Sequence, residues 1–310
     1  MSNKNFEIKQ EIVTDKVEGK ILGQRVSAPK QYCPEILVRV PRSENRTLYG
    51  IQEDNLPFHG YDVWNAYEVS CLTEKGLPIF CQAKIVYPCT SKYIVESKSL
   101  KLYLNSFNMM KYGRYSDETK RIISKMIAQD LSSLLECDVK VHLFDEEMKN
   151  ENAPLFTQYR HITDFVNLDD IEFKEFNEAP QLLKIDPETN SSLFIKFPLL
   201  RSNCKITHQP DWGTAFIHID ALYNINIETL VQYLVSFRGE NHFHEECCEM
   251  IFKRLFDLLT QCNETFDLAV SCIYTRRGGI DICPTRYTNP RLADNNLIQP
   301  TVDCQKLLNQ

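Results

Sequence analysis

The chain has 310 residues, enough for about two domains at ~150 residues each. Hydrophobic residues make up 43% and charged residues 25% of it, as in soluble globular proteins and unlike disordered or membrane-spanning chains. The formal net charge of −7 leaves no basic surplus for a polynucleotide backbone or an anionic bilayer, so we expect neither direct nucleic-acid binding nor a membrane partner.

The first half of the chain predicts two strands, two helices and two further strands, after a proline-containing lead-in over residues 1–55. Valine and aromatic residues flank Gly76-Leu-Pro, which favours a hairpin, and helical spacing of apolar residues follows. Ser116, before two acidic residues, is the expected N-cap of the second helix. In chain order we expect strands at 61–72 and 79–87, helices at 99–110 and 116–137, and strands at 139–144 and about 170–177.

The same order of elements returns in the second half. A polar segment with two prolines, residues 179–192, is expected to be a linker between a first module over 1–178 and a second over 193–310. In chain order we expect strands at 192–200 and 213–220, helices at about 227–235 and 243–259, and strands at 266–275 and 280–287. The chain is therefore predicted to be an α+β protein made of two ββααββ units.

Glycine is scarce, and its spacing is informative. The ten glycines form neither G-x-G-x-x-G nor the phosphate-binding loop G-x-x-x-x-G-K-[ST]. A dinucleotide, if one is used, must be held by a scaffold other than a Rossmann unit.

The cysteines and the N-terminus indicate a cytoplasmic location. The twelve cysteines are scattered without a C-x-x-C pair, so we expect mostly buried free thiols in a reducing compartment. The first twenty residues lack an apolar secretory segment, and no stretch approaches the roughly 18 apolar residues of a spanning helix.

The densest group of potentially reactive side chains is SNCKITHQPDWG (202–213), between two expected strands. Cys204, followed by Lys205, would be a thiolate nucleophile if its pKa were depressed, and Asp211, turned back by Pro210, would be its acid or base. Spacing alone favours the alternative of a packed structural thiol. Trp212 is predicted to lie in the core.

Three more strings have a functional and a structural interpretation. His244 and Glu245 are a titrating imidazole and an acceptor for an amide-rich ligand, or simply a charged first helical turn. Lys98 and Lys101, near the possible caps Ser97 and Ser99, form an anion site at a helix N-terminus, or are solvated. The run Arg276-Arg277-Gly278-Gly279 is a phosphate-binding corner or a tight turn.

Together these strings resemble a known family. ESKSLKLYLNSFN (96–108), LLRSNCKITHQPDWG (199–213), YLVSFRGENHFHEECCE (233–249) and YTRRGGIDICP (274–284) are similar to the long, two-module NADPH-dependent 7-cyano-7-deazaguanine reductases, the nitrile reductases of queuosine biosynthesis. The resemblance spans nearly the whole chain. It implies the tunnelling fold, with two tandem ββααββ modules and antiparallel sheets, a homodimer, two NADPH per turnover and no metal.

The resemblance also implies roles for individual residues. Cys204 matches the nucleophile that forms a covalent thioimide, and Asp211 matches the proton-transfer group, assisted by His244. The substrate-binding positions match Val95, Glu96, Ser97, His244 and Glu245, and the NADPH-binding positions match Ser97, Lys98, Arg277 and Gly278. The chain departs from the family at Lys205, His208 and Cys283, which affects details of thiol reactivity rather than the reaction class. Because Glu96 and Cys204 lie in different halves, the site is expected between modules or between subunits.

Two other functions stay open at this point. Cys204, His208, His244 and Cys247 are an alternative zinc-ligand set, which would make the protein a cyclohydrolase-like enzyme of the same fold acting on a purine or pterin. A non-catalytic purine-binding protein is the other alternative. The resemblance favours the reductase over both.

Overall fold

The computed structural model describes residues 28–144, 151–187, 192–299 and 302–304, so residues 1–27 of the lead-in lie outside it. Its centre is one nine-stranded sheet. In spatial order the strands are β12 (Asn241–His242), β9 (Leu193–Cys204), β10 (Pro210–Ala221), β13 (Phe266–Tyr274), β14 (Ile280–Tyr287), β2 (His59–Leu72), β3 (Pro78–Pro88) and β5 (Lys140–Phe144), with β7 (Arg160–His161) also paired to β9. All pairs are antiparallel except those of the short β12 and β7 with β9. The expected α+β architecture is confirmed.

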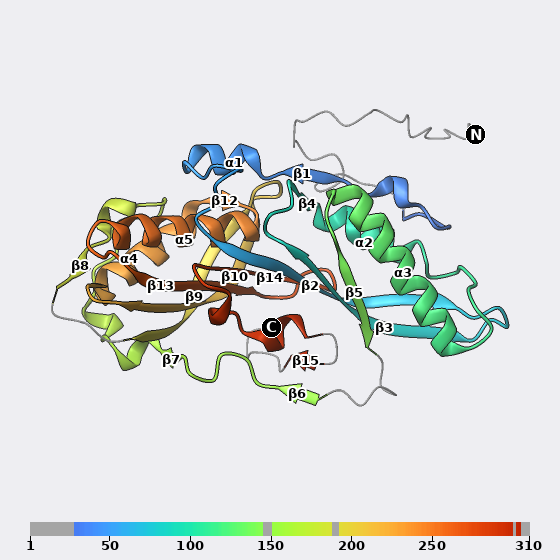
Figure 1. Cartoon of the computed structure of the whole chain (residues 1–310). Helices are drawn as coiled ribbons and strands as arrows, with labels where there is room; N and C mark the ends of the chain where they lie inside the picture. Colours follow the sequence, from blue (N-terminus) through green and yellow to red (C-terminus); the bar gives the residue numbers. More distant parts are fainter. Residues whose placement is uncertain (1–27, 145–150, 188–191, 300–301, 305–310) are drawn as a thin grey trace.

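Four helices pack on one face of this sheet (Figure 1). They are α2 (Ser97–Asn105) and α3 (Ser116–Leu135) in the first half, and α4 (Ile227–Ser236) and α5 (His244–Thr260) in the second. The apolar faces of α2 and α3 form one core with β2, β3 and β5, and those of α4 and α5 form another with β9, β10 and β13. Because β14 pairs with β2, the two cores lie side by side on one continuous sheet.

The second half has the full ββααββ order, whereas the first contributes to the sheet β2, β3, β5 and the two-residue β7, which pairs with β9 of the second half. The strand expected at 170–177 is wrong. This stretch has no regular structure; Ile171 and Phe173 pack on the core of the second half, while the acidic residues between and after them stay partly or fully exposed. The segment thus lies on the second half, and 180–186 likewise packs there as a short turn and β8 (Ile185–Asp186), which pairs with β11 (Asn224–Ile225).

Smaller elements complete the described fold. They are β1 (Arg39–Pro41), which pairs with β4 (Tyr93–Val95), α1 (Ser43–Leu48), α6 (Asn295–Ile298), and β6 (Glu151–Ala153), which pairs with β15 (Val302–Cys304). Among the helices that the structure describes, none combines the length and apolar character needed to cross a membrane.

The helix starts differ in detail from the expectation. The N-cap of α3 is Tyr115, one residue before the predicted Ser116, and its side chain makes no capping bond. The N-cap of α2 is Glu96, whose Oε2 accepts a hydrogen bond from the Ser99 amide at 2.7 Å. Ser99 instead donates its hydroxyl to the Glu96 carbonyl.

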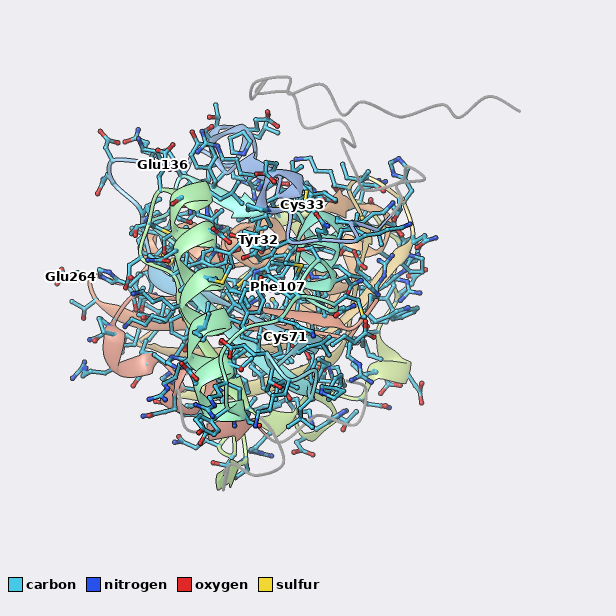
Figure 2. The ribbon with its side chains drawn as sticks, turned by 90° about the vertical axis from the view of Figure 1, so that its right-hand side faces the viewer. Tyr32, Cys33, Cys71, Phe107, Glu136 and Glu264 are labelled. Carbon is cyan, nitrogen blue, oxygen red and sulfur yellow. The ribbon has the colours of Figure 1, made fainter. Side chains whose placement is uncertain are left out.

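The described part of the lead-in lies across both halves. Tyr32 donates to Asp130 of α3 at 2.7 Å and packs edge-on against Phe107, beside α3 in Figure 2. Further along, Arg46 of α1 is fully buried and binds Glu249 of α5 at 2.8 Å. A buried arginine with a carboxylate partner that is itself buried fixes the position of both elements. The lead-in therefore ties α5 to the first half.

Candidate active site

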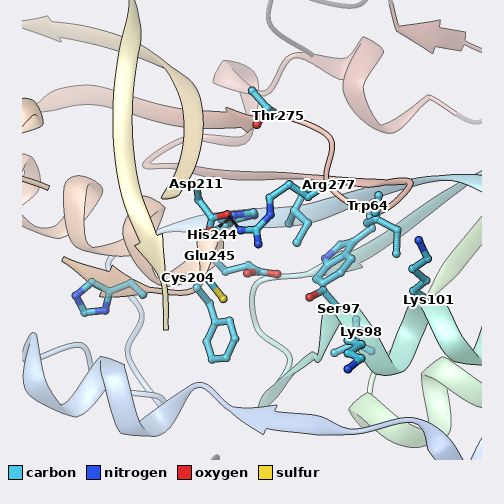
Figure 3. Close-up of a pocket in the computed structure, with 16 residues that line it drawn as sticks. Trp64, Ser97, Lys98, Lys101, Cys204, Asp211, His244, Glu245, Thr275 and Arg277 are labelled. Carbon is cyan, nitrogen blue, oxygen red and sulfur yellow. Dashed lines mark hydrogen bonds and ion pairs between the residues drawn. The ribbon is translucent and has the colours of Figure 1, made fainter. Parts of the chain in front are cut away.

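One pocket opens where the two halves meet, with a cavity of about 230 Å³ (Figure 3). It is bounded by side chains from β2, the β4–α2 junction, the ends of β9 and β10, the start of α5 and the β13–β14 turn. The residues that line it are Trp64, Val95, Ser97, Lys98, Lys101, Cys204, Asp211, His242, Phe243, His244, Glu245, Thr275, Arg277, Gly278, Ile280 and Ile282. All the residues that the resemblance matches to a catalytic, substrate-binding or NADPH-binding position line it, except Glu96. The pocket therefore lies between the two halves of a single chain, one of the two places in which the site is expected.

Cys204 is the last residue of β9, and its backbone is held on two sides. Its amide donates a hydrogen bond to the Gln209 carbonyl at 2.8 Å, and its carbonyl accepts one from the His208 backbone amide at 2.9 Å. On the other side β12 runs parallel to β9, with His242 opposite Cys204. Lys205 points elsewhere and pairs with Glu246 at 2.9 Å, so the lysine does not act on the sulfur as its sequence position suggested.

Asp211 stands near the start of the neighbouring strand, β10, and is only 4% exposed. One carboxylate oxygen pairs with Arg277, and the other lies 3.3 Å from Nε2 of His244. Burial by itself would raise the pKa of Asp211, but the hydrogen bond from His244 and the charge of Arg277 outweigh it and hold that pKa below its usual range. Asp211 is thus a carboxylate at neutral pH, able to accept a proton.

His244, the first residue of α5, is oriented by stacking of its ring on a neighbouring aromatic side chain. The imidazole stacks on Tyr274 with 3.8 Å between ring centroids and 7° between planes. Its Nδ1 is buried without a hydrogen-bond partner among the described residues. His244 thus presents one nitrogen to Asp211 and keeps the other available.

Glu245 has a buried carboxyl group with one oxygen that no described residue contacts by a hydrogen bond. It is 2% exposed, and its Oε1 has no hydrogen-bond partner in the described part of the chain. Burial, followed by the nearby charge of Asp62, raises the pKa of Glu245 to about 8, although Arg42 and Arg286 oppose the shift. These arginines are already paired, since both bind Asp62. Glu245 is therefore suited to a ligand that brings its own N–H donors.

Glu96 lies beside the pocket rather than in its lining. One oxygen caps α2, as described above, while Oε1 is buried and unpaired. Burial raises the pKa of Glu96, although its bonds to Ser99 lower it. Its neighbours Val95 and Ser97 do line the cavity.

Part of the pocket wall is basic. Lys98, Lys101 and Arg277 line it, together with the N-terminus of α2. Gly278 and Gly279, with φ of +57° and +82°, form the two-residue turn between β13 and β14, closed by two hydrogen bonds between Arg277 and Ile280. The tight-turn interpretation of the Arg-Gly string is confirmed, and Arg277 and Gly278 of this turn line the pocket.

Several pocket residues were not predicted from the sequence as site residues. They are Trp64, His242, Phe243, Thr275, Ile280 and Ile282. Trp64 reaches the site because β2 pairs with β14, and no local pattern reveals that pairing. Conversely, Trp212 is not a core residue. It is 45% exposed, with the guanidinium groups of Arg201 and Arg238 within 5.8 Å of its ring centre.

The alternative zinc ligands are not gathered at one place. His208 bonds Asn241 at 2.8 Å through Nδ1 and is exposed, whereas Cys247 is fully buried on α5. Burial raises the pKa of Cys247 to about 12, which keeps it a thiol. Among the described residues no three His, Cys, Asp or Glu side chains are arranged to hold a metal ion.

Comparison with known proteins covers both halves of the chain. Residues 28–143 match the family described as "Nitrile reductase, 7-cyano-7-deazaguanine-reductase N-term", and residues 210–291 match the family of QueF-like proteins. The chain is 40% identical over 277 residues to the NADPH-dependent 7-cyano-7-deazaguanine reductase of Rickettsia bellii, covering 86% of this chain and 92% of that protein. It is 37% identical over 276 residues to the protein of the same name from Coxiella burnetii, covering 89% and 94%.

Proposed function

This chain belongs to the family of the NADPH-dependent 7-cyano-7-deazaguanine reductases, and we propose that it performs their reaction through a covalent bond between Cys204 and the nitrile carbon. The reaction reduces the nitrile of 7-cyano-7-deazaguanine to the aminomethyl group, in the queuosine pathway. The observation that supports the covalent route is the meeting of Cys204, Asp211 and Glu245 in one pocket with the basic residues of the α2 end.

The first step in this proposal is addition of sulfur to the nitrile. Asp211, held as a carboxylate, accepts the proton of the Cys204 thiol and returns it to the nitrile nitrogen as the S–C bond forms. The product is a thioimide, whose protonated C=N carbon accepts hydride far better than a nitrile does. His244 assists by donating a hydrogen bond to Asp211.

The remaining steps reduce that carbon twice. NADPH, when bound, supplies a hydride for each reduction. The thiohemiaminal formed first expels the Cys204 thiolate to give an imine, and the second hydride yields the primary amine. In this proposal Asp211 and His244, which contact each other in the pocket, deliver the protons that each stage requires.

We place the deazaguanine ring against the two glutamates. Adjacent N–H groups of a guanine-type edge match a carboxylate, and such charge-assisted bonds are strong. Glu245, and beside the pocket Glu96, each have a buried oxygen with no partner among the described residues. In this proposal the N–H groups of bound substrate donate hydrogen bonds to these two oxygens.

We place NADPH along the basic part of the pocket wall, which adjoins the substrate groups because Lys98 follows the N-cap Glu96 and Arg277 contacts Asp211. The residues there fit its phosphates: Lys98 and Arg277 supply positive charge, and the N-terminus of α2, with Ser97, supplies amide donors. Gly278 lets the cofactor approach the turn closely. Lys101, whose ammonium lies 3.5 Å from Glu68, extends this basic surface.

We also propose that the enzyme is a cytoplasmic homodimer that acts on the free deazapurine rather than on nucleic acid. The net charge of −7 supports a small-molecule substrate. Sedimentation of the purified protein tests the dimer.

The proposed reaction predicts that two NADPH are oxidised for each amine formed, because converting a nitrile to a primary amine takes two hydrides. The loss of NADPH absorbance and the yield of aminomethyl product, measured together, give the ratio. A ratio near one, or free imine or aldehyde as the main product, would contradict the mechanism.

Nitrile binding is expected to depend on pH through Glu245. With a pKa of about 8 in the free protein, Glu245 carries a proton at pH 7, and accepting N–H donors from the ring requires its loss. Affinity should therefore rise as the pH increases from 7, by up to about tenfold per unit, and level off above about 8. Calorimetry with Cys204→Ala protein measures this without covalent reaction. In Glu245→Gln protein the dependence should disappear; a flat profile in the protein that keeps Glu245 contradicts the assignment.

Arg277→Ala is expected to raise KM for NADPH about tenfold or more, the effect of losing a charge-assisted bond of about 1.5–3 kcal/mol. Because Arg277 also pairs with Asp211, the pKa of Asp211 should rise as well, so kcat should change too. Arg276→Ala is the matched control, since that neighbour stacks on Tyr67 outside the pocket. An unchanged KM for NADPH in the Arg277 variant would mean that Arg277 is only part of the turn and does not bind the cofactor.

A further inference from the structure

Trp64 is a pocket residue whose one polar atom is unused. It lies on β2, is 1% exposed, and its indole lines the cavity. Its Nε1–H is buried and has no hydrogen-bond partner in the part of the chain that the structure describes. Buried tryptophans usually give this N–H a partner, because leaving a desolvated donor unpaired is costly. The missing acceptor therefore needs an explanation.

The indole is held rigidly by the surrounding sheet. Trp64 stands between Ile85 on β3 and Ile282 on β14, in the register of both strand pairs, and belongs to the core of the first half. Figure 3 shows it across the pocket from Cys204 and Asp211, on the side of Ser97. Its N–H direction is thus set before any ligand enters, as a specificity contact requires.

The unpaired groups at the pocket are complementary to a guanine-type ring. Glu245 and Glu96 each offer a free acceptor, whereas Trp64 offers a free donor. A guanine-type ring carries N–H donors next to two acceptors, the carbonyl at C6 and the ring nitrogen N3. The carboxylates match its donors and leave its acceptors without a partner.

We propose that Trp64 is a specificity-determining residue, whose indole N–H donates a hydrogen bond to an acceptor of the substrate ring, the C6 carbonyl or N3. The proposal rests on the function proposed above. A site that aims a buried polar group at the substrate rejects analogues that lack the matching atom, since the group then stays unpaired. Trp64 thereby adds selectivity for the substrate ring, which the bond between Cys204 and the nitrile carbon does not provide.

Trp64→Phe tests this, because phenylalanine keeps an aromatic ring but removes the N–H. Binding is measured by calorimetry in the Cys204→Ala background, with the nitrile, its analogue lacking the C6 carbonyl and its analogue with carbon at position 3. We expect Trp64→Phe to weaken nitrile binding about tenfold, with NADPH binding unchanged. For the analogue that lacks the relevant acceptor, Trp64→Phe should make no difference. The chain's other tryptophan supplies the matched control, Trp212→Phe, on the exposed surface.

Two outcomes overturn the proposal. One is equal affinity for the nitrile with and without the indole N–H. The other is the same loss with all three ligands, which assigns Trp64 to packing. Failure of the proposed function looks different. In that case the nitrile binds the Cys204→Ala protein neither with Trp64 nor with Trp64→Phe, and it forms no adduct with protein that retains Cys204.

Discussion

Mixing the protein with 7-cyano-7-deazaguanine in the absence of NADPH is expected to give a covalent adduct on Cys204. Its mass increase should equal the whole substrate, because addition to a nitrile expels nothing. The pocket supports this, since the sulfur at the end of β9 shares the cavity with Asp211, which can accept the thiol proton. Intact-protein mass spectrometry followed by peptide mapping locates the bond.

Replacing Cys204 by Ala or Ser should remove both the adduct and turnover. A serine hydroxyl is a far weaker nucleophile at neutral pH, and losing a covalent nucleophile lowers kcat by about 10⁴-fold or more. The chain has twelve cysteines, so the other eleven act as internal controls. Cys247 is the strictest of them, because it lies nearby on α5 but is fully buried with a pKa of about 12. An adduct on any cysteine other than Cys204 would make Cys204 the structural thiol that its spacing favours.

The sequence predicted most elements because their signals are local. The β2–β3 hairpin, α3 and the complete ββααββ order of the second half follow from periodicity and breaks within each segment. The pocket strings were recognisable for the same reason, since Cys204 ends a strand and His244 begins a helix. Family membership then followed from several such strings in order.

What the sequence did not reveal depends on contacts between distant segments. Trp64 enters the pocket only because β2 pairs with β14, more than two hundred residues away. The partner of Lys205 is Glu246 on α5, and Trp212 is 45% exposed with Arg201 and Arg238 at its ring. The stretch 170–177 has alternating apolar residues but packs on the second core without a strand partner. Local patterns carry no information on such partners.

Asp211→Asn is expected to lower turnover about 10²–10⁴-fold, the usual contribution of one proton-transfer group. The amide keeps the size of the side chain and can still contact His244 and Arg277, but it cannot take the thiol proton and return it to nitrogen. Adduct formation should slow by a similar factor, because that proton moves in the first step. Single-turnover adduct formation and steady-state NADPH oxidation measure the two effects separately. Asp220→Asn is the matched control, since Asp220 lies on the same strand but is exposed.

The rate of adduct formation at acidic pH distinguishes Asp211 from other proton acceptors. Because the pKa of Asp211 is lowered, its carboxylate form, and the ion pair with Arg277, persist as the pH falls through the ordinary aspartate range near ~3.9. Adduct formation should therefore lose no rate to Asp211 protonation above that range, and Arg277→Ala should move the loss to higher pH. The ion pair's contribution to the free energy of unfolding has the same pH dependence. It is present at neutral pH and is lost as the pH falls through the folded-state pKa of Asp211. If Asp211→Asn protein forms the adduct at an undiminished rate, the proton passes through another group, and His244, with its unpaired Nδ1, becomes the acceptor to test.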